Sequence, residues 1–171
     1  MNIEITTYYL ETRHPDELTG PSTIPDGFEI RKIGIPSPEF NRFLYAVVGK
    51  KWLWIDRLVW TPEKWESWVD RPELETWVAY MNGAPAGYFE LEMQADRSVE
   101  IAFFGLLPRF IGKGIGGCLL GEAIRKAWEM GPSRVWVHTC TLDHPHALRN
   151  YEARGLTIVR EEIHIQNIPD D

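Results

Sequence analysis

The sequence has few cysteines. Only Cys118 and Cys140 occur among its 171 residues. Two cysteines are too few for the disulfide framework of a small secreted domain, and too few for a zinc site built from several cysteines. Both of these protein classes are therefore excluded, and we expect the two thiols to be reduced.

Long apolar segments are also absent. No run approaches the roughly 18 residues that a membrane-spanning helix needs. The opening residues, "MNIEITTYYL", lack the basic and apolar regions of a secretory signal peptide. We therefore expect a cytoplasmic protein that has no membrane partner.

Positive charge is scarce as well. The chain has 18 Lys and Arg against 25 Asp and Glu, which gives a net charge of -7 and a pI near 5.3. A nucleic-acid-binding protein needs a basic face to neutralise phosphates. The charge balance therefore argues against a nucleic-acid partner, although it leaves local basic pockets open.

Apolar residues, by contrast, are abundant enough for one core. The chain is 44% hydrophobic and 12% aromatic, and it shows no internal repeat or low-complexity segment. This length and composition are typical of one globular domain over residues 1–171. Residues 1–12 alternate like a strand, and two helices are predicted to begin at Ser37-Pro38 and Thr61-Pro62, where an N-cap residue precedes proline.

The second half of the chain predicts the order β, β, β, α, β, α, β. Residues 75–93 form a predicted hairpin about a short turn at residues 82–84, and residues 98–107 form a third strand. Residues 114–130 have one apolar helical stripe, which Gly131 and Pro132 terminate. A strand over 134–142, a helix over 144–155 and a strand over 156–166 follow. The predicted fold class is α/β.

The stretch "RFIGKGIGG", residues 109–117, places four glycines between a predicted strand and a predicted helix. Such a turn aims main-chain N–H groups and the positive end of a helix dipole at one point, which suits a phosphate or pyrophosphate. A P-loop is excluded because Gly114, and not Ser or Thr, follows Lys113. The dinucleotide fingerprint matches literally, but too few residues follow it to complete a doubly wound sheet.

Two motifs resemble the GCN5-related N-acetyltransferase (GNAT) superfamily. "VEIAFFGLLPRFIGKGIGGCLL" is similar to its strand followed by a Gly-x-Gly signature, and "ALRNYEARGL" is similar to its Ala-x-x-x-Tyr-Glu-x-x-Gly helix. The resemblance covers residues 76–160, whereas residues 1–75 match only in the order of elements. The family usually has Gln or Arg where this chain has Ile111, a position that contributes mainly through its backbone.

The resemblance implies a mixed, mostly antiparallel central sheet flanked by helices. It also implies acetyl-CoA as cosubstrate without a metal, and a small-molecule or peptide amine as acceptor, and it leaves a homodimer open. Residues 76–160 would form the acetyl-CoA-binding core, and residues 1–75 the N-terminal strand and the acceptor-side helices. The implied cofactor-binding residues are Leu106, Leu107, Ile111, Gly112, Lys113, Gly114, Ile115, Gly116, Gly117 and His144, where His144 stands at a position that is often Asn in the family.

Acetyl transfer to a protonated amine needs a general base. Removing the proton from a lysine-like amine at neutral pH costs roughly 4 to 5 kcal/mol. The resemblance implies this role for Glu100, on the strand that leads to the glycine loop. Strand alternation predicts that Glu100 lies on the same side as Ala102, Phe104 and Leu106. A salt-bridged carboxylate is the alternative, and Glu90, Glu92 and His138 remain candidate bases.

The departing thiolate needs a general acid. Tyr151 stands where the resemblance places that acid, and the alternative is an aromatic ring that only packs beside its helix. A main-chain N–H near Leu106 would polarise the thioester oxygen.

Cys140 is interpreted as a small core residue and not as a nucleophile. His138, Cys140, Asp143, His144 and His146 lie within nine residues, but their spacing does not predict a metal site.

Six tryptophans lie between Trp52 and Trp77, within the segment that the resemblance assigns to the acceptor. They could form an apolar or cation-binding wall. The helical spacing of Trp65 and Trp68 favours core packing instead.

Two other functions stay open, namely a domain that binds acyl-CoA without turnover and an enzyme that binds a nicotinamide nucleotide.

Overall fold

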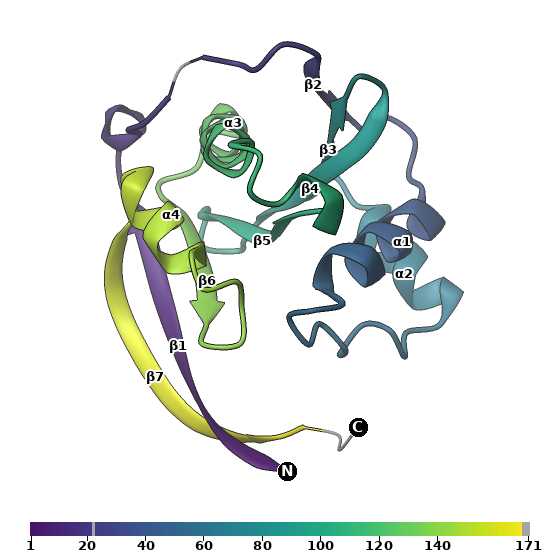
Figure 1. Cartoon of the computed structure of the whole chain (residues 1–171), viewed down its shortest axis with the longest axis vertical. Coiled ribbons are helices and arrows are strands. Elements are labelled where there is room, and N and C mark those ends of the chain that lie inside the picture. The colour runs from purple at the N-terminus through teal and green to yellow at the C-terminus, as the bar shows by residue number, and fades with distance from the viewer. Residues whose placement is uncertain (22, 169–171) are drawn as a thin grey trace.

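The computed structural model describes residues 1–21 and 23–168, so the last three residues of the predicted domain lie outside it. These described residues form a seven-stranded sheet and four α-helices (Figure 1). In chain order the elements are β1 (Asn2–Thr12), η1 (Pro15–Glu17), β2 (Phe28–Lys32), α1 (Pro38–Gly49), α2 (Pro62–Val69), β3 (Leu74–Met81), β4 (Ala84–Met93), β5 (Val99–Leu106), η2 (Pro108–Phe110), α3 (Gly116–Glu129), β6 (Val135–Cys140), α4 (Ala147–Ala153) and β7 (Thr157–Asn167).

The sheet is mixed and mostly antiparallel, as predicted. Its strand order is β2-β3-β4-β5-β6-β1-β7, and every neighbouring pair is antiparallel except β5 and β6. The parallel pair is short, because only Val99 with Val135 and Glu100 with Trp136 are in register. Beyond these residues β5 and β6 diverge, and this gap in the ladder positions the site described below.

Two apolar clusters lie on opposite faces of the sheet. On one face α3 packs against β4, β5 and β6, and the stripe predicted for this helix is buried. On the other face α1 packs through Leu44 and Val48 against Val78 and Tyr88. Figure 1 shows α1 and α2 lying together, away from α4 and the β1–β7 pair. Helices therefore cover both faces of the central strands.

Local sequence signals account for the turns. Met81 ends β3 and Ala84 begins β4, and both intervening residues, Asn82 and Gly83, have positive φ. This is the two-residue hairpin turn that an Asn-Gly pair favours. The Thr61 hydroxyl caps α2 by accepting the Lys64 N–H at 3.2 Å, whereas Ser37 occupies the N-cap of α1 without a side-chain cap bond. Proline at the first helical position favours the start of α1 there, because its ring presets a helical φ.

Two features of the sheet were not part of the sequence-based prediction. The short edge strand β2 was not predicted, and it pairs only with β3. The first strand, β1, lies between β6 and β7, and pairs with β7 from Asn2 to Glu11 as the long curved ribbon seen in Figure 1. Within the described part of the chain, no helix is both long enough and apolar enough to cross a membrane.

Candidate active site

A cavity of about 730 Å³ opens where β5 and β6 diverge. Its walls come from both faces of the sheet. Leu106, Tyr151 and the glycine loop contribute from the α3 face, and Tyr45 and Phe103 contribute from the α1 face. The cavity therefore connects the two faces through the gap between the two strands.

The glycine loop forms one mouth of this cavity. Gly112 and Gly114 have φ of +77° and +78°, a conformation that side chains disfavour, and no atom lies within 4 Å of the place where a Cβ would stand on either residue. Helix α3 begins directly afterwards at Gly116, without a side-chain cap. The loop thus presents bare backbone at a helix N-terminus, as the sequence predicts.

Only some of the main-chain N–H groups in the predicted cofactor-binding segment, residues 106–117, are free to bind a ligand. The first N–H groups of a helix have no partner within it, and residues 112–115 donate no main-chain hydrogen bond to another described residue. The Ile111 N–H, however, donates to the Pro108 carbonyl at 3.3 Å, and the Leu107 N–H donates to the Ala86 carbonyl at 2.8 Å. The predicted donors at Leu107 and Ile111 are therefore already engaged, and the available donors begin at Gly112.

The other predicted cofactor-binding residues fall into three groups. Leu106 lines the cavity, with Cδ1 3.7 Å from the Cβ position of Gly116. Ile115 is buried and offers only its backbone, whereas Lys113 is exposed. His144 also lines the cavity, and burial together with the neighbouring His146 lowers the pKa of its imidazole.

Tyr151 lies in the cavity wall, as the predicted acid role requires. It is 7% exposed, and its ring contacts Phe104 edge-on at a centroid distance of 6.2 Å. Burial, and to a smaller extent the Asp143 carboxylate, raises the pKa of the Tyr151 phenol. The phenol therefore holds its proton at neutral pH and could donate it to a group in the cavity.

The predicted side for Glu100 is wrong. The pairing of β4 with β5 shifts register, because Leu91 faces Ile101 while Glu90 faces Phe103, which leaves Ala102 as a bulge. Phe104 and Leu106 consequently pack toward α3, whereas Glu100 lies on the opposite face from its buried neighbours Val99 and Ile101. A bulge inverts the alternation beyond it, and sequence periodicity did not reveal it.

Glu100 reaches the cavity only through another residue. Its Oε1 lies 3.3 Å from Nδ1 of His138, and its Oε2 accepts a 3.0 Å hydrogen bond from Gln94. Glu100 itself does not line the cavity, whereas the half-exposed His138 does. The structure thus joins two of the predicted candidate bases into one pair, in which the imidazole is the member at the cavity.

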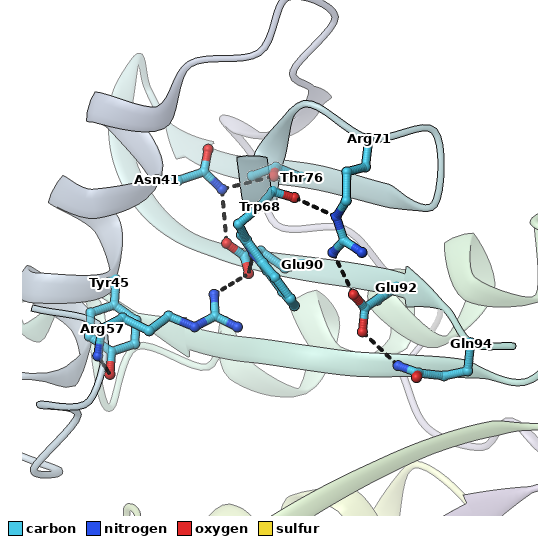
Figure 2. A network of polar contacts seen from close by, with 9 residues as sticks. All are labelled: Asn41, Tyr45, Arg57, Trp68, Arg71, Thr76, Glu90, Glu92 and Gln94. Atoms are coloured by element: carbon cyan, nitrogen blue, oxygen red, sulfur yellow. Dashed lines mark hydrogen bonds and ion pairs between the residues drawn. The ribbon is translucent and has the colours of Figure 1, made fainter. Parts of the chain in front are cut away.

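The reserve carboxylates Glu90 and Glu92 belong to a network of hydrogen bonds and ion pairs (Figure 2), and neither lines the cavity. Glu90 is 1% exposed and accepts hydrogen bonds from Asn41 at 2.9 Å, Arg57 at 3.2 Å and Trp68 at 3.0 Å. Glu92 pairs with Arg71 and accepts from Gln94. Their bonds leave little capacity for taking a proton from a substrate.

Arg57 connects the hydrogen-bond network of Glu90 to the cavity, because it pairs with Glu90 and also lines the cavity. Its guanidinium lies over the rings of Trp68 and Phe103, 4.0 and 4.1 Å from their centroids, and it pairs with Glu90. Its main-chain N–H donates to the Tyr45 hydroxyl at 3.3 Å, as Figure 2 shows. These contacts attach residues 50–61 to the sheet. No sequence pattern pointed to this arginine, because it lies in an irregular segment between α1 and α2.

The tryptophan-rich segment has two roles. Trp65 is 1% exposed and belongs to the core, as its spacing predicts. Trp52 and Trp54 instead line the cavity and contact its far wall, because Trp52 meets His144 at a centroid distance of 5.0 Å and Trp54 Nε1 lies 3.4 Å from Oδ1 of Asp143. Residues 50–61 therefore bridge the cavity from α1 to the loop that precedes α4.

The Cys140 thiol lines the cavity, and burial together with Asp143 raises its pKa. A raised pKa keeps the sulfur as a thiol, which is a weak nucleophile. Over residues 1–21 and 23–168, no group of three or more His, Cys, Asp or Glu side chains is arranged to hold a metal ion.

The chain was compared with protein-family models, curated proteins and solved structures. The model of the acetyltransferase (GNAT) family matches residues 40–156. A search of curated proteins found no match.

Solved structures show the same fold. A GCN5-related N-acetyltransferase from Kribbella flavida has a TM-score of 0.68 at 22% identity, covering 94% of this chain and 57% of its own. One from Sphaerobacter thermophilus has a TM-score of 0.72 at 17% identity, covering 95% and 51%. An aminoglycoside acetyltransferase from an uncultured soil metagenomic sample, solved with trehalose, has a TM-score of 0.66 at 16% identity, covering 86% and 100%. The chain thus spans little more than half of the first two structures.

Proposed function

The chain belongs to the acetyltransferase (GNAT) family, since the family model covers more than half of it, and on this premise we propose that it transfers the acetyl group of acetyl-CoA directly to an amine. One observation carries the proposal. The cavity between β5 and β6 connects the unengaged amides of the glycine loop on one face with the aromatic side chains of α1 and residues 50–61 on the other. Donor and acceptor can therefore meet from opposite faces.

The glycine loop binds the donor in this proposal. Main-chain N–H groups at a helix N-terminus favour a pyrophosphate, and the absence of side chains at Gly112 and Gly114 lets it approach. The pantetheine arm then follows the gap between β5 and β6 toward Leu106 and Tyr151. With the Leu107 amide engaged, the amide of Leu106 is the donor that we assign to the thioester oxygen.

Proton transfer is assigned to two groups on opposite sides of the gap. Tyr151 donates its phenolic proton to the departing sulfur of coenzyme A. His138 takes the proton of the attacking ammonium group, directly or through water, and Glu100 orients the imidazole through its contact with Nδ1. The amine nitrogen then attacks the thioester carbon, and the carbon–sulfur bond breaks without a covalent enzyme intermediate. Glu100 is a positioning residue in this scheme, in place of the base expected from sequence.

The proposed activity is tested by incubating the protein with acetyl-CoA and a panel of amines, following thiol release and the mass of the products. We expect acetylated amine and free coenzyme A in equal amounts. We also expect acetyl-CoA, but not NAD, to raise the melting temperature. Stabilisation by acetyl-CoA without acetylation of any amine would indicate a binding module instead, and indifference to acetyl-CoA would contradict the assignment of the loop.

Replacing Gly116 by Ala should separate donor binding from stability. The added methyl group meets nothing closer than Leu106 at 3.7 Å, so the protein accommodates it, and alanine favours the helix. It stands, however, where the pyrophosphate must approach the backbone. We expect acetyl-CoA affinity, measured by titration calorimetry, to fall by about tenfold, or about 1.4 kcal/mol, with no loss of melting temperature.

Gly121→Ala is the matched control, since Gly121 lies in the same helix with no atom within 4 Å of its Cβ position. It should leave acetyl-CoA affinity unchanged. Equal affinities for the two variants would remove the N-terminus of α3 from the donor site.

Replacing Glu100 by Gln should lower kcat while the acetyl-CoA KM stays constant, because the imidazole of His138 loses the carboxylate that orients it. We expect this loss to stay below the about 10²-fold that a general base itself contributes. Glu92→Gln, in the same sheet but bonded to Arg71, should leave kcat unchanged. A loss of kcat in Glu100→Gln much larger than about 10²-fold would instead identify Glu100 as the base.

A further inference from the structure

The part of the cavity on the α1 face is lined mainly by aromatic side chains. We call it the acceptor pocket and define it by Tyr45, Trp52, Trp54, Asp56, Trp60 and Phe103. We propose that this pocket selects a monoamine whose amino group is carried on a short chain from a flat aromatic group, in preference to polyamines and other polycations. The inference rests on the proposed function and names the class of its acceptor.

The aromatic wall is continuous. The ring centroids of Tyr45, Trp54 and Phe103 lie 5.0 to 5.5 Å from one another, in tilted or edge-to-face arrangements. Aromatic side chains form favourable contacts with other rings in such geometries. A flat apolar group that enters beside these three residues would therefore exchange water for aromatic surface.

The wall is also held in place. The Tyr45 hydroxyl accepts the Arg57 main-chain N–H, and Trp54 reaches Asp143 through its indole nitrogen. Gly49, the last residue of α1, leaves room for Trp54, because a Cβ there would stand 2.3 Å from Trp54 Cβ. A pocket that is ordered before binding loses less entropy when a rigid ring enters it.

The charges of the pocket suit one cationic group. Two carboxylates, Asp56 and Asp143, line the cavity. Both oxygens of Asp143 are engaged, since Oδ1 meets Trp54 and Oδ2 accepts from Thr139 at 2.6 Å and from the Cys140 N–H at 3.1 Å. Asp56 is exposed and pairs with no cation among the described residues. Asp143 keeps its negative charge, because these donors are neutral, but it stands at the far wall of the cavity, outside the acceptor pocket. Asp56 is thus the one carboxylate of the acceptor pocket as defined, and it can attract one ammonium group, whereas the further charges of a polycation would meet no second carboxylate within the pocket.

The remaining charged groups do not alter this balance. Arg149 also lines the cavity, but it is exposed on α4, away from α1 and the acceptor pocket. Arg57 is buried and paired with Glu90, so it offers no net attraction for a carboxylate on the acceptor. His138 stands at the β6 wall of the cavity with Glu100 behind it, where it can receive the proton of the amine. The pocket thus combines an apolar aromatic wall, one attracting carboxylate and one proton acceptor.

The first experiment compares kcat/KM for three acceptors at saturating acetyl-CoA. These are 2-phenylethylamine, n-butylamine as the same kind of amine without a ring, and spermidine as a polycation. We expect 2-phenylethylamine to exceed each of the others by at least about tenfold. A value for spermidine or n-butylamine equal to or above that for 2-phenylethylamine would overturn the proposal.

A variant pair locates the selectivity. Trp54→Leu should reduce the ratio between 2-phenylethylamine and n-butylamine toward one, mainly through KM, with acetyl-CoA affinity unchanged. Trp77→Leu changes a tryptophan that packs toward Phe89 outside the cavity, and should keep the ratio. An unchanged ratio in folded Trp54→Leu would contradict the assignment of the wall.

A binding measurement separates this inference from the proposed function. Titration calorimetry with the same three amines, in the presence of CoA, needs no acetyl transfer. Preferential binding of 2-phenylethylamine without acetylation would support the acceptor pocket and contradict the activity. Acetylation of spermidine with no preference for the ring would support the activity and contradict the pocket. Absence of binding by 2-phenylethylamine would overturn the proposal.

Discussion

Replacement of Glu90 by Ala should lower the free energy of unfolding by about 3 to 5 kcal/mol, the cost of leaving one partner of a buried ion pair uncompensated. Glu90 is 1% exposed, and Arg57, its only cationic partner among the described residues, is 8% exposed among aromatic rings. The substitution also removes the acceptor of the Trp68 N–H. Chemical denaturation followed by tryptophan fluorescence measures the change.

Glu92→Ala is the matched control, because Glu92 lies two residues away on the same strand. Its partner Arg71 is 31% exposed at the side chain, and partly solvated pairs contribute about 0 to 1 kcal/mol. A third variant, Glu90→Gln, keeps the shape of the side chain and isolates the loss of charge. If Glu90→Ala and Glu92→Ala destabilise the protein equally, the network around Arg57 does not have the role assigned to it.

The same variant connects stability with the acceptor pocket. Arg57 attaches residues 50–61 to the sheet and donates its main-chain N–H to the Tyr45 hydroxyl (Figure 2). Once Glu90 is lost, the segment that carries Trp52 and Trp54 loses its buried anchor. At a temperature where the variant remains folded, we expect a higher KM for the amine and little change in acetyl-CoA affinity.

Replacement of Tyr151 by Phe should lower kcat by about 10²- to 10⁴-fold, the usual contribution of a general acid. The ring and its contact with Phe104 remain, so acetyl-CoA affinity should change little. Steady-state kinetics with thiol detection, together with calorimetric titration of acetyl-CoA, provides the two readouts. A normal kcat in Tyr151→Phe would assign the leaving-group proton to another donor.

Tyr88→Phe is the control for loss of a buried hydroxyl. Tyr88 is fully buried on the α1 face, and its hydroxyl has no hydrogen-bond partner within the described chain. Removing an unsatisfied buried hydroxyl should not destabilise the protein. We expect unchanged turnover and a melting temperature equal to or above that of the parent.

The pH dependence follows from the direction of the Tyr151 shift. Burial raises the pKa of the phenol above its ordinary value of 10.0. The group is therefore protonated in the folded protein throughout the range up to about pH 10, and kcat should show no alkaline loss from its deprotonation there. Above the unfolded pKa, the unfolded chain releases this proton more readily than the folded one, so stability falls as the pH rises.

Sequence patterns predicted the elements that depend on local chemistry. Asn82-Gly83 specified a turn with two positive φ angles, and the apolar stripe of α3 specified which face is buried. The glycine loop was placed correctly because positive φ at Gly112 and Gly114 and the start of α3 are encoded within a few residues. Tyr151 was found through its motif, and the structure puts it in the cavity wall.

Features that depend on long-range pairing were not predictable in this way. The insertion of β1 between β6 and β7 is decided by residues more than a hundred positions apart. The bulge at Ala102 arises from the pairing of β5 with β4, and it turns Glu100 to the other face. Arg57 becomes part of the site only because α1, α2 and β5 bring aromatic rings around it and β4 brings Glu90. None of these contacts leaves a periodic signal in one sequence.

The most direct test of the account is a crystal structure with coenzyme A bound. We predict that the diphosphate oxygens lie within about 3.2 Å of main-chain nitrogens in residues 112–117, and that the thiol lies in the gap between β5 and β6 beside Tyr151. A diphosphate bound elsewhere, with the amides of residues 112–117 bonded to the protein itself, would contradict the account.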